Sequence, residues 1–138
     1  MRAVLDTNVV VSGLLWRGAP RQILEQARTG HFQLFTSDML LAELEDVLGR
    51  SKLAKPLSQN NLTAEQDFDA YAALSMIVVA GDIERVSADP DDDQVLACAL
   101  AAKADVVVSG DGHLLELGQY RGIEIVTAAE CLKQLGKD

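Results

Sequence analysis

Short apolar runs alternate along the chain with longer segments of helical periodicity, and this alternation constrains the fold more than any other feature. The expected strands lie at residues 2–5, 32–37, 105–111 and 122–127. The expected helices lie at residues 19–28, 37–50, 63–78, 93–104 and 128–136. Strands that alternate with helices form parallel sheets with right-handed crossovers, and continuous apolar strands suit a sheet covered on both faces. The sequence therefore predicts an α/β fold, a three-layer α/β/α domain with a central parallel sheet of about four or five strands.

Capping residues indicate where two of these helices begin. Ser37 or Asp38 caps the helix at 37–50, and Thr63 and Gln66 form a capping box at the start of 63–78. The polar stretches between the helices are expected to be irregular. They are residues 51–62 and the loop 82–93, which has room for a short strand at 83–86.

Length, composition and charge limit the possible classes of protein. The 138 residues suit one domain spanning 1–138, and the 49% of apolar residues suffice for a sizeable core. No apolar run is long enough to span a bilayer and no signal peptide is recognisable, so we expect a cytoplasmic protein without membrane contact, with Cys98 and Cys131 as buried thiols. A net charge of −9 argues against gripping nucleic acid by bulk charge, but it leaves room for an enzyme that approaches phosphates through metal ions.

Four acidic side chains stand where a parallel sheet would bring them to one edge. Asp6 follows the first strand, Asp111 ends the third, and Asp93 begins the helix before that third strand. The functional crevice of such a sheet lies outside the carboxyl ends of its strands. Glu43, at the border of the apolar stripe of its helix, is expected to point toward the same edge. We therefore expect these four carboxylates to converge.

Converging carboxylates favour a metal site. Like charges at close range cannot all ionise without compensation, and oxygen ligands suit Mg²⁺ or Mn²⁺, which stabilise phosphoryl charge and activate water. Each acid alone also has a simpler interpretation. Asp92 or Asp93 can cap a helix, Asp111 can serve a turn, and Glu43 can be a surface acid. The joint placement favours the metal site over these separate interpretations.

Four segments together resemble PIN-domain nucleases, in particular the small single-domain bacterial toxins of toxin–antitoxin pairs. The segments are VLDTNVVVSGLLW (4–16), TSDMLLAELEDVL (36–48), DPDDDQVLACALAAKADVVVSGDGHLL (89–115) and GIEIVTAAECL (122–132). The resemblance covers essentially the whole chain. It implies Mg²⁺- or Mn²⁺-dependent cleavage of RNA, an antitoxin protein as partner, and a homodimer.

The resemblance also assigns residues. It implies catalytic and metal-binding roles for Asp6, Glu43, Asp93 and Asp111, with Asn8 and Ser109 in support. The 18-residue step from 93 to 111 favours Asp93, although its neighbour Asp92 stays open as the ligand. Asp89 has no assigned role beyond support of the acidic cluster.

An acidic chain needs local positive groups to hold RNA. The candidates are Arg50, Lys52 and Lys55, and also Arg17 and Arg21, although each can equally be a solvated charge. Apolar side chains on the helices at 37–48 and 63–78 are expected to serve a dimer contact or a groove for the antitoxin. The alternative is that they all pack inside the chain's own core.

Other functions fit the sequence less well. A haloacid dehalogenase-type phosphatase needs a second acid where this chain has Asn8. A calcium loop starting at Asp89 would need Gly and Glu where Gln94 and Leu100 stand, and the Gly-rich Lys motif of a P-loop does not occur. A PIN-like scaffold that binds RNA or protein without cutting is the remaining alternative.

Overall fold

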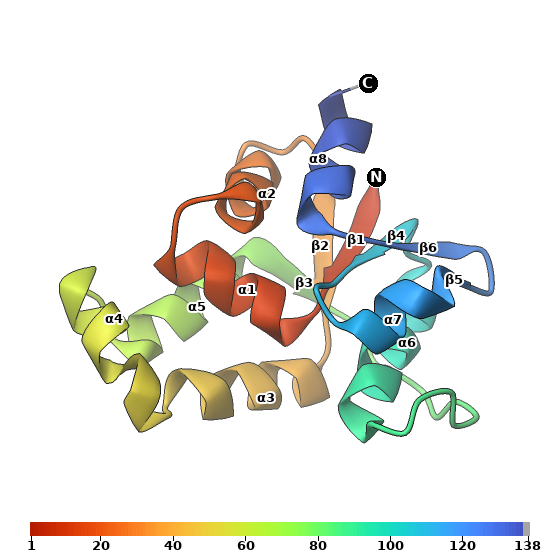
Figure 1. Cartoon of the computed structure of the whole chain (residues 1–138), viewed down its shortest axis with the longest axis horizontal. Coiled ribbons are helices and arrows are strands. Elements are labelled where there is room, and N and C mark those ends of the chain that lie inside the picture. The colour runs from red at the N-terminus through yellow and green to blue at the C-terminus, as the bar shows by residue number, and fades with distance from the viewer. Residues whose placement is uncertain (137–138) are drawn as a thin grey trace.

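A mostly parallel sheet forms the centre of the computed structural model, which describes residues 1–136 (Figure 1). The six strands of the described chain are β1 (Arg2–Leu5), β2 (Gln33–Thr36), β3 (Ser75–Ile77), β4 (Val106–Val108), β5 (Gln119–Tyr120) and β6 (Ile123–Val126). Their order is β3-β2-β1-β4-β6-β5. All neighbours pair in parallel except β5, which is antiparallel to β6. The predicted parallel sheet is confirmed, with a short antiparallel edge strand added to it.

Helices connect and cover the strands. They are α1 (Thr7–Leu15), α2 (Ala19–Arg28), α3 (Asp38–Leu48), α4 (Ala54–Gln59), α5 (Ala64–Leu74), α6 (Pro90–Ala102), α7 (Gly112–Leu117) and α8 (Ala128–Gly136), and a 3₁₀ turn, η1 (Ser51–Leu53), precedes α4. Within residues 1–136, no helix combines the length and the apolar character that a membrane crossing requires.

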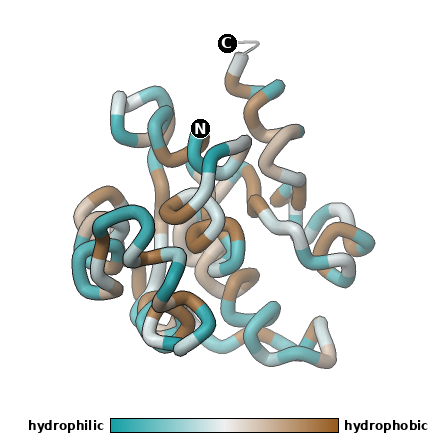
Figure 2. The backbone as a smooth tube through the Cα atoms, turned by 60° about the vertical axis from the view of Figure 1, so that its left-hand side comes forward, coloured by the Kyte–Doolittle hydropathy of each residue, from teal (hydrophilic) through white to brown (hydrophobic). Residues whose placement is uncertain are grey.

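Alternate residues of each strand enter two different cores. Ala3 and Leu5 of β1 pack in a core built with α1, α2, α3, α5 and α8, whereas Val4 packs in a second core with α6 and α7. The same alternation separates Val107 from its neighbours on β4. Along the helices the hydropathy colours alternate, which is typical of elements with one face on a sheet (Figure 2). These two cores make the three layers that the sequence predicts.

The capping predictions hold where the structure tests them. The Ser37 hydroxyl accepts the Leu40 N–H at 3.3 Å and caps α3. Thr63 and Gln66 exchange the two hydrogen bonds of a capping box, at 2.9 and 3.1 Å. Cys98 and Cys131 are both buried free thiols, as expected, and burial raises the pKa of each to about 11.

Several expected boundaries were wrong. The helix expected at 63–78 ends at Leu74, because Ser75–Ile77 instead pair with β2 as edge strand β3. No strand forms at 83–86 within the described chain. The stretch 51–62, expected to be irregular, contains η1 and α4, and α1 directly after Asp6 was not predicted. Helix α1 is buried on most sides, so it shows no clear polar face in the sequence.

Candidate active site

Asp6 stands at the carboxyl end of β1, where the chain turns into α1. Its backbone N–H donates to the Val108 carbonyl of β4 at 2.9 Å, so the end of β1 is fixed against β4. The side chain is only 9% exposed, and burial raises the pKa of its carboxyl group. The hydroxyl of Ser109 donates to Asp6 Oδ2 at 2.8 Å and opposes that shift.

Ser109 also connects Asp6 to Asp111. Its oxygen accepts the backbone N–H of Asp111 at 2.9 Å. Asp111 in turn caps α7, because its Oδ1 accepts the backbone N–H groups of His113 and Leu114 at 2.7 and 3.3 Å. The Ser109 hydroxyl thus lies between the Asp6 side chain and the backbone of Asp111. His113 is exposed in the first turn of α7.

Of the two neighbouring acids in α6, the structure places Asp92, and not Asp93, beside the other carboxylates. Asp92 is 5% exposed; burial raises its pKa, and the negative charge of Asp111 adds to the rise. The charge of Asp92 in turn raises the pKa of Asp6. Asp93 faces the preceding loop, where its Oδ1 accepts the N–H of Ser87 at 2.9 Å. Neighbours in a helix point about 100° apart, so only one of the two can face the site.

Glu43 lies half-buried in α3 within electrostatic reach of Asp6. Burial raises the pKa of Glu43, and the negative charges of Asp91, Asp6 and Asp89 raise it further. The Thr7 side chain lowers this pKa as a hydrogen-bond partner. Asp89 itself caps α6, since its Oδ1 accepts the Asp91 N–H at 2.9 Å. The sheet edge therefore gathers Asp6, Glu43, Asp92 and Asp111, with Asp89 at the border.

Within residues 1–136, no cationic side chain forms a salt bridge with any of these acids. Among residues 1–136 the one salt bridge joins Arg50 to Asp46, away from these acids. The atoms available as metal ligands are all carboxylate oxygens, which suit Mg²⁺ or Mn²⁺. In the described part of the chain, no group of three or more His, Cys, Asp or Glu side chains lies close enough together to hold a metal ion as it stands. Mg²⁺ fits such an open arrangement, because it usually keeps several waters and uses one or two carboxylates.

A family model described as a PIN domain matches residues 2–113 of this chain. The chain belongs to the PIN domain family. Among solved structures, it is similar to VapBC2 from Rickettsia felis bound to a DNA fragment from their promoter, with a TM-score of 0.61 and 17% sequence identity. That match covers 91% of this chain and 97% of the other. No curated protein sequence matches the chain.

Two polar residues of this PIN domain site were missed by the sequence reasoning. The Thr7 side chain lowers the pKa of Glu43 as a hydrogen-bond partner. The Ser87 hydroxyl donates to Asp92 Oδ2 at 2.9 Å. Thr7 could have been found from the sequence, because it is a hydroxyl residue directly after Asp6. Ser87 could not, because it lies in a loop without any recognisable pattern. Asn8, expected to support Asp6, is exposed and lines a cavity of about 220 Å³ together with Ser109.

The basic residues expected to hold RNA lie apart from the carboxylates. Lys52 and Lys55 are exposed on η1 and α4, at the opposite end of α3 from its first turn (Figure 1). Arg50 pairs with Asp46 at 3.2 Å on the surface. Arg21 donates to the carbonyl oxygens of Gly13 and Leu14, so it ties α2 to the end of α1. Arg17 is exposed.

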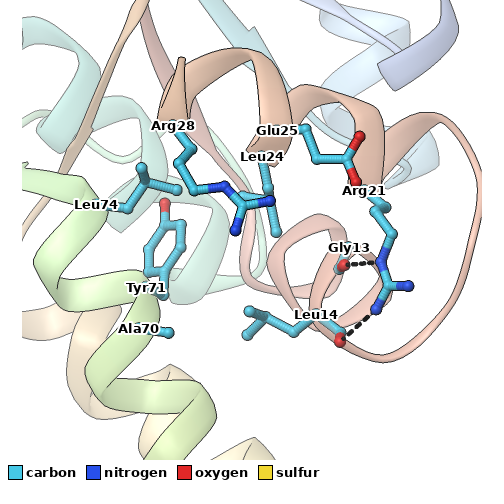
Figure 3. Close-up of a pocket in the computed structure, with 9 residues that line it drawn as sticks. All are labelled: Gly13, Leu14, Arg21, Leu24, Glu25, Arg28, Ala70, Tyr71 and Leu74. Atoms are coloured by element: carbon cyan, nitrogen blue, oxygen red, sulfur yellow. Dashed lines mark hydrogen bonds between the residues drawn. The ribbon is translucent and has the colours of Figure 1, made fainter. Parts of the chain in front are cut away.

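A second cavity of about 380 Å³ lies between α1, α2 and α5 (Figure 3). Arg21, Glu25 and Arg28 of α2 line it, and the buried Tyr71 of α5 forms part of its wall. Among the described residues, the Tyr71 hydroxyl has no hydrogen-bond partner. The cavity lies at the last turn of α1, whereas Asp6 precedes its first turn, so the two sites are separate.

The apolar stripe of α3 belongs to the chain's own core. The stripe residues Leu40, Leu41, Leu44, Val47 and Leu48 are all buried, whereas Met39, a large apolar residue outside the stripe, is widely exposed, at 59%. On α5, Tyr71 is buried and Phe68 and Leu74 are partly buried against the same core. The stripe of α3 and Tyr71 therefore pack inside the chain's own core, which was the alternative to a dimer contact or an antitoxin groove, and the homodimer itself stays a prediction.

Proposed function

We propose that this PIN domain is an Mg²⁺- or Mn²⁺-dependent endoribonuclease that hydrolyses phosphodiester bonds. The proposed ligand set is Asp6, Asp92, Asp111 and Glu43, with Asp92 in the place that the sequence favoured for Asp93. The observation that carries the proposal is the buried carboxylate of Asp6, whose pKa is raised by burial and by the charges of Asp92 and Asp111. Buried acids that repel one another and have no bonded cation are typical of a site built for one.

The chain's own groups have separate tasks in this proposal. Asp6, Asp92 and Asp111 have to be ionised to hold the ion, and Ser109 keeps the first and last of them in place through its two hydrogen bonds. A divalent ion bound there would stabilise the charge on the scissile phosphate and lower the pKa of an attacking water. Glu43 is half-exposed, so its carboxylate could act as the general base that accepts the proton of that water.

We also propose that the enzyme acts as the toxin of a toxin–antitoxin pair and is bound by an antitoxin protein. The resemblance of the chain to such toxins and its structural similarity to the VapBC2 complex support this role. The proposed homodimer has to use a surface other than the buried stripe of α3.

A cleavage assay tests the catalytic proposal. Purified protein is incubated with a fluorescently labelled RNA in Mn²⁺, in Mg²⁺ and in EDTA, alongside the Asp6→Asn variant. We expect cleavage by the parent protein in either metal, none in EDTA and very little with the variant. The scaffold that binds without cutting predicts RNA binding with no cleavage in any metal, and that result would overturn the nuclease proposal.

A further inference from the structure

The loop before α6 folds back onto the first turn of that helix through Ser87. The Ser87 hydroxyl donates to Asp92 Oδ2 at 2.9 Å and accepts the backbone N–H of Asp89 at 3.2 Å. One side-chain oxygen therefore contacts both the residue that caps α6 and the carboxylate that faces the site. The other carboxylate oxygen of Asp92, Oδ1, remains available to a hydrogen-bond donor or to a metal ion.

The backbone of Ser87 is fixed as well. Its N–H donates to Asp93 Oδ1 at 2.9 Å, and the N–H of Val86 donates to the same oxygen at 3.2 Å. The guanidinium of Arg85 donates to the carbonyl oxygens of Ser87 and Ala88 at 3.3 and 3.1 Å. Every hydrogen-bonding group of Ser87 thus has a partner, although the residues around it are exposed.

These contacts divide the two acids of α6 between two tasks. The Asp93 carboxylate holds the loop amides, so it is committed to the loop and points away from Asp6 and Asp111. Asp92 receives from that loop the hydroxyl that restricts its rotation. Loss of a side chain that hydrogen-bonds a metal-ligating group typically costs roughly 10- to 100-fold in metal affinity.

We propose that Ser87 and Asp93 are positioning residues for Asp92: Asp93 fixes the loop, and Ser87 fixes the orientation of the Asp92 carboxylate. The inference rests on the proposed metal site and names residues outside its ligand set. It predicts that Asp93 acts through an oxygen acceptor alone, without need of negative charge, whereas Asp92 acts through its charge.

The test is Mn²⁺ binding measured by titration calorimetry, together with the thermal unfolding midpoint in EDTA. Ser87→Ala should weaken Mn²⁺ binding about tenfold, and Ser87→Thr, which keeps the hydroxyl, should restore most of the affinity. Ser58→Ala, a change at an exposed serine on α4, is the matched control and should bind as the parent does. Asp93→Asn keeps the accepting oxygen and should bind Mn²⁺ nearly as the parent does, whereas Asp93→Ala should resemble Ser87→Ala and Asp92→Asn should lose most binding.

Two outcomes would overturn the positioning roles while the nuclease proposal stands. The first is a Ser87→Ala protein with the affinity of the parent. The second is an Asp93→Asn protein as impaired as Asp92→Asn, with an unfolding midpoint in EDTA like that of the parent, since Asp93 would then be a ligand. A parent protein that binds no Mn²⁺ would instead contradict the proposed function itself, so the two failures are distinguishable.

Discussion

The hydroxyl of Ser109 donates a hydrogen bond of 2.8 Å to Oδ2 of Asp6, a residue 103 positions earlier in the chain. The contact joins the carboxyl ends of β1 and β4, which are neighbours in the sheet. Through the Asp111 N–H, the same oxygen also fixes the start of α7. The orientation of two acids thus depends on one buried side chain.

Asp6→Asn should reduce RNA cleavage about a hundredfold or more, because the buried charge that holds the ion is lost. The amide oxygen can still accept from Ser109, so the fold should persist. In EDTA the variant should be as stable as the parent or slightly more stable, since the cost of burying the charge and the repulsion from Asp92 and Asp111 are both relieved. Cleavage is measured on labelled RNA and stability by urea unfolding; parental cleavage rates in Mg²⁺ would remove Asp6 from the site.

Ser109→Ala should destabilise the metal-free protein by about 1–2 kcal/mol, because Asp6 Oδ2 and the Asp111 N–H both lose their partner. Urea unfolding in EDTA measures the change, and Ser58→Ala on the exposed face of α4 is the control. A free energy of unfolding equal to that of the parent would mean that water replaces the hydroxyl without cost.

The stability of the metal-free protein should fall as the pH rises above the ordinary carboxyl pKa of about 4. Burial raises the pKa of Asp6, Glu43 and Asp92, so the folded state holds protons that the unfolded state has already released. Their destabilising effect is absent below the ordinary carboxyl pKa and complete above the raised values. Unfolding in EDTA across this range measures the slope, which should be smaller in Asp6→Asn.

Added Mg²⁺ should oppose that trend, because the ion binds the ionised carboxylates and its affinity rises with pH. A ligand that binds only the folded state stabilises it. The unfolding midpoint in Mg²⁺ should therefore exceed that in EDTA by more at pH 7 than at pH 5. An equal difference at both pH values would contradict the assignment of these acids as ligands.

Reversing the charges of Arg50, Lys52 and Lys55 together should weaken RNA binding and flatten its salt dependence if these residues contact phosphates. All three are exposed, and Arg50 already has Asp46 as a surface partner. Binding is measured by fluorescence anisotropy at several salt concentrations with the Asp6→Asn protein, for which we expect very little cleavage. A double reversal of Arg121 and Lys133 is the control, and an unchanged salt slope in the triple variant would exclude this patch.

Gly13→Ala should destabilise the fold by about 1–3 kcal/mol. A Cβ at this position would lie 2.7 Å from Leu24 Cδ1 and 2.9 Å from the Pro20 carbonyl oxygen. The carbonyl belongs to the backbone of α2, so the helices have to separate. Gly81→Ala, which has open space around it, should change stability little. A Gly13→Ala protein as stable as the parent would show that α1 and α2 can move apart without cost.

The amino-acid sequence by itself determined the alternation of strands and helices, and with it the edge at which Asp6 and Asp111 meet. Local patterns suffice for this, because hydrophobic periodicity and capping residues act over a few positions, and parallel strands all end on one side of a sheet. The capping box of Thr63 and Gln66 belongs to the same class of local signal.

The tertiary structure alone decided which acid of α6 faces the site. Neighbouring residues differ by about 100° around a helix, and the direction of each depends on where the helix begins and on what its outer face contacts. Asp89 sets that beginning, and the loop at Ser87 holds Asp93 away from the site. Likewise, Ser75–Ile77 form strand β3 because they pair with β2. Whether a short apolar segment becomes a strand depends on the neighbouring strands in the fold more than on its own sequence.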